Sequence, residues 1–124
     1  MEKAQAAAAE LCAKLNVTHI EGMENGTAAR QGDLCVLTVV QAAHEDALLG
    51  LKDDLQGKIL ADATARVDFR DPKPPEPPSA ARHAQDLLGQ GVRVVAAFQN
   101  VPAHALKKLS QPLDTDVLVC ADDQ

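Results

Sequence analysis

The sequence predicts an α/β fold with a doubly wound, mostly parallel sheet and helices on both faces. Helical spacings alternate with short apolar runs along the chain, and this alternation is typical of right-handed crossovers between parallel strands. The run at 33–40 is apolar at almost every position, as in strands that helices cover. Two Phe, no Tyr and no Trp leave Ala, Val, Leu and Ile to form the core.

The first third of the chain is expected to hold two helices and a short strand. A helix is predicted at 2–15 from a stripe of small and apolar residues at three- and four-residue spacings. That stripe consists of Ala4, Ala7, Ala8, Leu11 and Leu15. A short strand at 17–20 follows, and Asn25 is expected to cap a short helix at 26–31.

The middle of the chain alternates between strand and helix. The strand at 33–40 precedes helical spacing over 42–55, which Gly57 is expected to end. The next strand is predicted at 58–63. Two strands joined by a helix in this way form a parallel crossover unit.

A proline-rich segment at 68–79 is expected to be an extended loop. Its five prolines interrupt any regular element. It is either a surface crossing or lid, which we favour, or a ligand for a proline-reading domain. Ser79 then caps a helix that is predicted to run to Leu88.

The last third is expected to complete one domain that spans 1–124. A strand at 92–98 leads to a short helix at 102–109, which has a proline in its first turn. A final strand is predicted at 116–120. The sequence contains no internal repeat and no sign of a second domain.

Composition excludes several classes of protein. A net charge of −6 and the scarcity of aromatic rings argue against nucleic-acid binding. No apolar run approaches the ~20 residues that span a bilayer, and the polar first residues do not resemble a signal peptide. The separated Cys12, Cys35 and Cys120 predict buried free thiols in a reducing cytoplasm rather than a disulfide or a zinc site.

Motifs for acid–base, nucleophilic or metal chemistry are missing from the sequence. It contains no G-x-S-x-G, no Walker A loop and no G-x-G-x-x-G, and its four histidines show no H-x-x-x-H spacing. Ligands of open parallel sheets bind at the carboxyl ends of the strands. Asp122 and Asp123 follow such an end, where they either form a turn or line a site.

Four segments carry a resemblance to a known family. Residues 25–39 are similar to a run N-x-x-A-A-x-x-x-D-V-V-V-L-T-V, 57–64 to GKIVVDAT, and 116–123 to DVLVCGDD. Residues 94–106 resemble the strand and loop that hold a deazaflavin coenzyme. In this order and spacing the segments resemble the F420:NADP oxidoreductases, the NADPH-dependent F420 reductases.

The resemblance implies an incomplete Rossmann-like fold: a single partial NADP-binding domain over 1–124, without the first strand, the Gly-rich turn and the C-terminal helical part of the family. It also implies hydride transfer between NADP(H) and coenzyme F420. The two cofactors carry that chemistry, and the protein sets distance and orientation. We therefore expect no catalytic side chain and no metal.

The resemblance further implies a set of cofactor-binding residues. Lys3 matches a lysine that binds the 2′-phosphate of NADP, and Thr38, Val39 and Val40 match the strand end beside the nicotinamide. The deazaflavin loop corresponds to Gln99, Asn100, Val101 and Pro102. Alternatively, Lys3 is a solvated charge, and Val39 and Gln99 are ordinary loop residues.

The sequence departs from the family pattern at three cofactor-side loops. Val40 stands where the family has Pro, Ala65–Arg66 where it has Asn-Pro, and Ala121 where it has Gly. These changes keep two alternatives open: a related enzyme with another substrate, and a non-catalytic, truncated Rossmann-like binding or interaction module.

Two expectations concern the chain by itself. Without a neighbouring first strand, 33–40 would expose an apolar sheet edge, so we expect the chain to form a homo-oligomer. Without a Gly-rich turn to hold the pyrophosphate, we expect poor NADP affinity.

Overall fold

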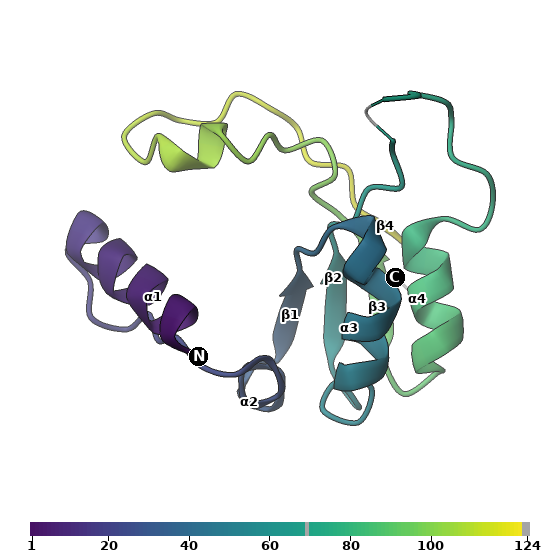
Figure 1. Cartoon of the computed structure of the whole chain (residues 1–124), viewed down its shortest axis with the longest axis horizontal. Coiled ribbons are helices and arrows are strands. Elements are labelled where there is room, and N and C mark those ends of the chain that lie inside the picture. The colour runs from purple at the N-terminus through teal and green to yellow at the C-terminus, as the bar shows by residue number, and fades with distance from the viewer. Residues whose placement is uncertain (69, 123–124) are drawn as a thin grey trace.

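The computed structural model describes residues 1–68 and 70–122, and helices alternate with strands along it (Figure 1). Two short 3-10 turns, η1 and η2, cover Gln41–Ala43 and Ala105–Lys107. The helices are α1 Glu2–Leu15, α2 Asn25–Gln31, α3 His44–Leu51 and α4 Ala80–Leu88. The strands are β1 Leu34–Leu37, β2 Ile59–Asp62, β3 Arg93–Ala96 and β4 Cys120–Ala121.

The strands form a mostly parallel open sheet in the order β1-β2-β3-β4. β1, β2 and β3 are parallel, with Leu37 level with Asp62, which is level with Ala96. The carboxyl ends of these three strands therefore meet at one edge of the sheet. β4 is antiparallel and pairs Ala121 with Val95. The predicted α/β class with a mostly parallel sheet is confirmed.

The core lies between the sheet and two helices. Figure 1 shows α3 and α4 side by side on one face of the sheet. The most deeply buried apolar side chains in this layer are Leu48, Leu55, Leu60, Ala84, Leu88 and Val92. An aliphatic core follows from the composition, as expected. Ser79 caps α4 as predicted, because its Oγ accepts a hydrogen bond from the Arg82 backbone N–H at 3.1 Å.

The second face of the sheet is only partly covered among the described residues. Side chains alternate along β1, so Cys35 and Leu37 point toward the helices while Leu34 and Val36 point away. Leu34 is 59% exposed and Val36 49% exposed. The expected helix cover on this face is not found there, because α1 lies apart from the sheet in Figure 1.

Residues 17–20 do not form the predicted strand; the segment folds back onto α1 instead. The Val17 backbone N–H donates to the Cys12 carbonyl at 3.1 Å, and Cys12 Sγ donates to the Ile20 carbonyl at 3.5 Å. Gly22 lies so close to α1 that an added Cβ would stand 2.2 Å from the backbone of Ala4. Contacts within the segment thus replace sheet pairing.

The ends of the other elements also differ from the prediction. Asn25 is the first residue of α2 rather than its cap. Glu24 takes the cap position and makes no side-chain capping hydrogen bond. The long helix predicted over 42–55 divides into η1, α3 and turns that lead to Gly57, whose φ is 77°. A left-handed φ of this kind suits glycine, so Gly57 does end this region.

The C-terminal third is less regular than predicted. The helix expected at 102–109 reduces to the single turn η2, and the strand expected at 116–120 to Cys120–Ala121. These residues are mostly exposed, so few tertiary contacts reinforce their local preferences. The predicted loop at 68–79 contains no helix or strand among its described residues. No described helix is long and apolar enough to cross a membrane.

Leu48 and Leu49 provide a test of this packing. Leu48 is 0% exposed in α3, whereas its neighbour Leu49 is 52% exposed. We expect Leu48→Ala to lower the free energy of unfolding by about 2–5 kcal/mol, because it leaves a cavity. Leu49→Ala should change it by less than about 0.5 kcal/mol. Urea denaturation followed by circular dichroism measures both, and equal effects would contradict the assignment of this helix face.

Candidate functional site

The loops that follow β1, β2 and β3 meet at Asp62, the last residue of β2. Its carboxylate is fully buried. Oδ2 lies 2.7 Å from Nε2 of His44, and Oδ1 accepts the Thr64 backbone N–H at 2.9 Å. The Asp62 carbonyl accepts a hydrogen bond from Nε2 of Gln99 at 2.7 Å. One residue therefore contacts the first residue of α3, the loop after β2 and the loop after β3.

Further hydrogen bonds hold the same edge together. The Thr64 hydroxyl donates to the Val39 carbonyl at 3.4 Å, which joins the loops after β2 and β1. The Ala97 backbone N–H also donates to the Asp62 carbonyl, at 3.2 Å. We call Asp62, His44, Thr64 and Gln99 the strand-end cluster. Its hydrogen bonds join the loop after β2 to the loop after β1, and the end of β2 to the loop after β3.

A second histidine lies beside the cluster. The ring of His83 in α4 is 6.2 Å from the ring of His44, centroid to centroid. Its Nε2 lies 3.5 Å from a carboxylate oxygen of Glu45, which is the residue after His44. His83 is partly exposed, whereas His44 is 5% exposed. The described residues contain no group of three or more His, Cys, Asp or Glu side chains placed to hold a metal ion.

Phe98 has an unusual backbone conformation next to the cluster. Its φ is 71°, in the left-handed region that bulky side chains rarely adopt. It follows β3 and precedes Gln99, and the Val101 backbone N–H closes a turn onto its carbonyl at 3.0 Å. Strained backbone of this kind persists where surrounding contacts hold it, and it is frequent at binding sites.

The structure brings together some of the predicted site residues. Val39 and Gln99 both join the strand-end cluster through hydrogen bonds. Thr38 and Val40 lie beside Val39 and are exposed, Val40 to 72%. Lys3 lies on α1, apart from this edge in Figure 1. The sequence thus predicted two of the loops that meet at the edge.

The deazaflavin loop is fixed at a second point. Asn100 Nδ2 donates to the Asp116 carbonyl at 2.6 Å, which ties the loop to the C-terminal segment. Val101 is half-buried and Pro102 is exposed. The roles of Gln99, Asn100, Val101 and Pro102 toward a cofactor stay predictions.

Sequence reasoning placed Asp62 and Thr64 at the carboxyl end of a predicted strand, where parallel sheets bind ligands, but named neither as a site residue. It missed His44, because nothing in the spacing indicates that His44 pairs with Asp62, 18 positions away.

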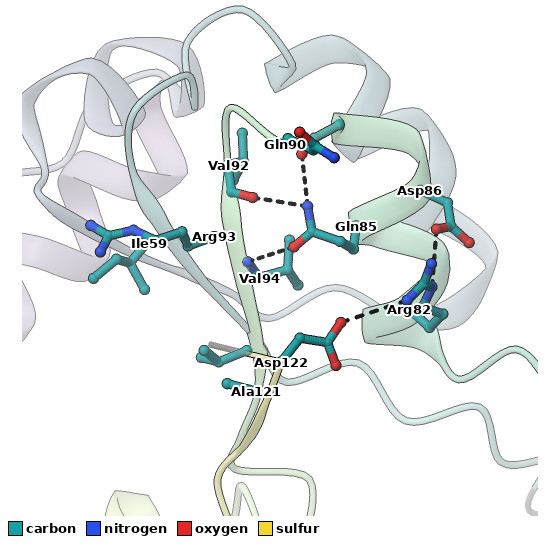
Figure 2. Close-up of a pocket in the computed structure, with 12 residues that line it drawn as sticks. Ile59, Arg82, Gln85, Asp86, Gln90, Val92, Arg93, Val94, Ala121 and Asp122 are labelled. Atoms are coloured by element: carbon teal, nitrogen blue, oxygen red, sulfur yellow. Dashed lines mark hydrogen bonds and ion pairs between the residues drawn. The ribbon is translucent and has the colours of Figure 1, made fainter. Parts of the chain in front are cut away.

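A hollow of about 750 Å³ lies elsewhere, between α4 and the outer edge of β3 (Figure 2). The Gln85 side chain crosses it: Nε2 donates to the Val92 carbonyl at 2.9 Å, and Oε1 accepts the Val94 N–H at 3.1 Å. Arg82 pairs there with Asp86 at 3.0 Å and Asp122 at 3.6 Å. Arg82 thus already has acidic partners, and we do not regard the hollow as a ligand site.

The final acidic pair is therefore only partly placed. Asp122 lines that hollow and pairs with Arg82, while Asp123 lies outside the described residues.

The cysteines also differ from expectation. Cys12 and Cys35 are half-buried, but Cys120 is exposed rather than buried, because β4 is a short edge strand. Burial raises the pKa of the Cys35 thiol.

The strand-end edge suits some parts of a dinucleotide better than others. Exposed apolar Val40 and the amides of Gln99 and Asn100 can contact uncharged rings without offering an acid or base. The pyrophosphate would need backbone N–H groups of a Gly-rich turn, and the sequence has no G-x-G-x-x-G. The fold and this edge define a Rossmann-like α/β domain whose loops meet at the strand ends.

Comparison with curated proteins identifies relatives of this chain that share one name. F420-dependent NADP reductase from Methanothermobacter thermautotrophicus is 39% identical over 83% of this chain and 47% of its own length. The enzyme of the same name from Methanothermobacter marburgensis is 34% identical over 98% of the chain and 58% of its own length. The enzyme of the same name from Methanocaldococcus jannaschii is 36% identical over 99% of this chain and 59% of its own length. No family model matches the chain.

Solved structures share the fold. A protein from Arthrobacter sp. FB24, provisionally assigned as an F420-dependent NADP reductase, aligns with a TM-score of 0.65 at 24% identity. It covers 79% of this chain and 47% of its own. A hypothetical protein from Sinorhizobium meliloti aligns with a TM-score of 0.60 at 24% identity, over 84% of this chain and 50% of its own.

The chain is a homologue of the F420-dependent NADP reductases, and it spans about half the length of the curated relatives it matches.

The strain at Phe98 can be measured. We expect Phe98→Gly to have a free energy of unfolding about 1 kcal/mol higher than Phe98→Ala, because only glycine adopts a positive φ without cost. Both variants lose the same ring, so their difference isolates the backbone conformation. Chemical denaturation of the two proteins measures it. If the alanine variant is as stable as the glycine variant, Phe98 is not strained.

Proposed function

We propose that this chain forms part of the cofactor site of an oxidoreductase that transfers a hydride between NADP(H) and coenzyme F420. The observation that carries this proposal is its identity of 34–39% to three F420-dependent NADP reductases over most of the chain. The strand-end edge supports it, since several loops converge there around one buried residue.

The bound cofactors would supply the hydride chemistry, and the protein would supply geometry. In this proposal Val40 covers the nicotinamide side with an apolar surface that excludes water, next to Thr38 and Val39. Gln99 is held by the Asp62 carbonyl and Asn100 by the Asp116 carbonyl, so their loop is fixed at two points beside the deazaflavin. Lys3 would attract the 2′-phosphate of NADP.

A second candidate function is a non-catalytic binding or interaction module. One observation favours it: the sequence contains no G-x-G-x-x-G phosphate turn. We place either function in the cytoplasm, in keeping with the three free cysteines.

Mixing the chain with NADPH and oxidised F420 distinguishes these functions. We expect no catalytic loss of the deazaflavin absorbance, and a Kd for NADPH above the low micromolar range, because the pyrophosphate lacks its usual anchor. F420 itself should still bind. Asn100→Ala should weaken F420 binding, while Asn16→Ala, at the C-terminal end of α1, should not.

Three outcomes follow from this assay, with an intact F420-dependent NADP reductase as positive control. Catalytic bleaching would show that the chain is an enzyme without the usual turn. Binding of F420 without turnover would support a partial cofactor site. If neither cofactor binds, the interaction module is the better proposal.

We also propose that the chain associates with itself through β1. The two outer edges of the sheet differ in how far other parts of the chain cover their backbone. At β3 the Gln85 amide bonds to the backbone of Val92 and Val94, and β4 pairs with the next residues. At β1 the outer edge is flanked by exposed Leu34 and Val36. An uncovered apolar edge invites pairing with another strand.

Light scattering over a wide concentration range tests this association. We expect the apparent mass to rise with concentration, and Val36→Lys to lower it toward the monomer, because an edge lysine opposes strand pairing. Leu49→Lys, at an exposed site on α3, is the matched control and should leave the association unchanged. A monomer at every concentration would contradict the proposal.

A further inference from the structure

Asp62 breaks the pattern of the core around it. It lies on the same side of β2 as Leu60, which packs against the helices, and both side chains are almost completely buried. A buried carboxylate is costly unless each oxygen accepts hydrogen bonds, and an apolar residue of similar size is often as stable or more so. Local departures of this kind are expected at functional sites.

The cost of burial is met by two donors at defined positions. Oδ1 accepts the Thr64 N–H at 2.9 Å and Oδ2 lies 2.7 Å from His44 Nε2. With the carboxylate ionised, both oxygens act as acceptors and His44 Nε2 carries the proton. No buried side-chain nitrogen or oxygen of the described residues lacks a partner, so this small polar network is complete.

The main-chain carbonyl of the same residue accepts from Gln99. Its distance to Gln99 Nε2 is 2.7 Å, and that bond reaches 37 residues along the chain. Thr64, held by the carboxylate, reaches Val39 through its hydroxyl. A shift of the Asp62 main chain would therefore disturb the loop after β1 and the loop after β3 together.

We propose that Asp62 and His44 are positioning residues that set the separation of the loops at 38–40 and 99–102. This inference rests on the proposed function, in which these loops hold the nicotinamide and the deazaflavin. The pair touches neither cofactor in this proposal. It acts through Thr64 on one loop and through Gln99 on the other.

Hydrogen exchange measures the coupling without any activity. We expect His44→Leu to accelerate amide exchange roughly tenfold or more in both 63–65 and 97–101, because Asp62 loses a charge-assisted hydrogen bond. His44→Gln keeps an N–H donor on a side chain of similar reach, and should stay within about threefold of the parent chain. Recovery by this conservative variant separates hydrogen bonding from packing.

His83→Leu is the matched control. It removes an imidazole that lies beside His44 and contacts Glu45 rather than Asp62. It should leave exchange at 63–65 and 97–101 unchanged. If His44→Leu does not fold, Asp62→Ala gives the same test, because it removes both carboxylate acceptors and leaves the main-chain carbonyl. Asp62→Asn, whose amide keeps an acceptor for Thr64 and can donate to His44, should then resemble His44→Gln.

Several results would overturn the proposal. Acceleration at 63–65 alone would make the pair a local turn anchor. Equal acceleration at every amide, or an equal effect of His44→Gln, would make His44 a packing residue. Where turnover is detected, His44→Leu should lower kcat and leave KM nearly unchanged. The exchange result stands even where no turnover is found, so it fails separately from the proposed hydride transfer.

Discussion

The fold depends on the pairing of β2 with strands on both sides. All of its residues from Ile59 to Asp62 are level with partners in β1 and β3. β2 is therefore both the centre of the sheet and the most buried strand, with Leu60, Ala61 and Asp62 each at most 3% exposed. α3 and α4 pack over it, and the parallel register brings the strand ends to one edge (Figure 1).

Asp62, the polar last residue of β2, matters because it is fully buried in the interior. In the apolar interior a carboxylate is tolerated only where donors surround it, so Asp62 and its partners constrain one another. The loops that contain Thr64 and Gln99 are therefore held in place as well. Under the proposed function, in which the chain holds two ring cofactors, such order would matter more than an acid or a base, since the cofactors would carry the reaction.

Much of the fold could be predicted from the sequence, and the predicted elements that the structure lacks have a common cause. The strands at 33–40, 58–63 and 92–98 are present with shorter bounds, and the helix that Ser79 caps runs to Leu88 as predicted, because apolar periodicity marks residues that face a core. Residues 17–20, 102–109 and 116–120 mostly do not become the regular elements expected. They lie outside the core layer, where no partner selects the conformation that their composition allows.

The candidate site divides in the same way. The sequence by itself determined the α/β class, the aliphatic core and the likeness to F420-dependent NADP reductases, because these depend on residue types at short spacings. Only the tertiary structure decided that His44 meets Asp62 and that Gln99 bonds to the same residue. Those contacts join positions 18 and 37 residues apart, and the register of neighbouring parallel strands, rather than local spacing, brings them together.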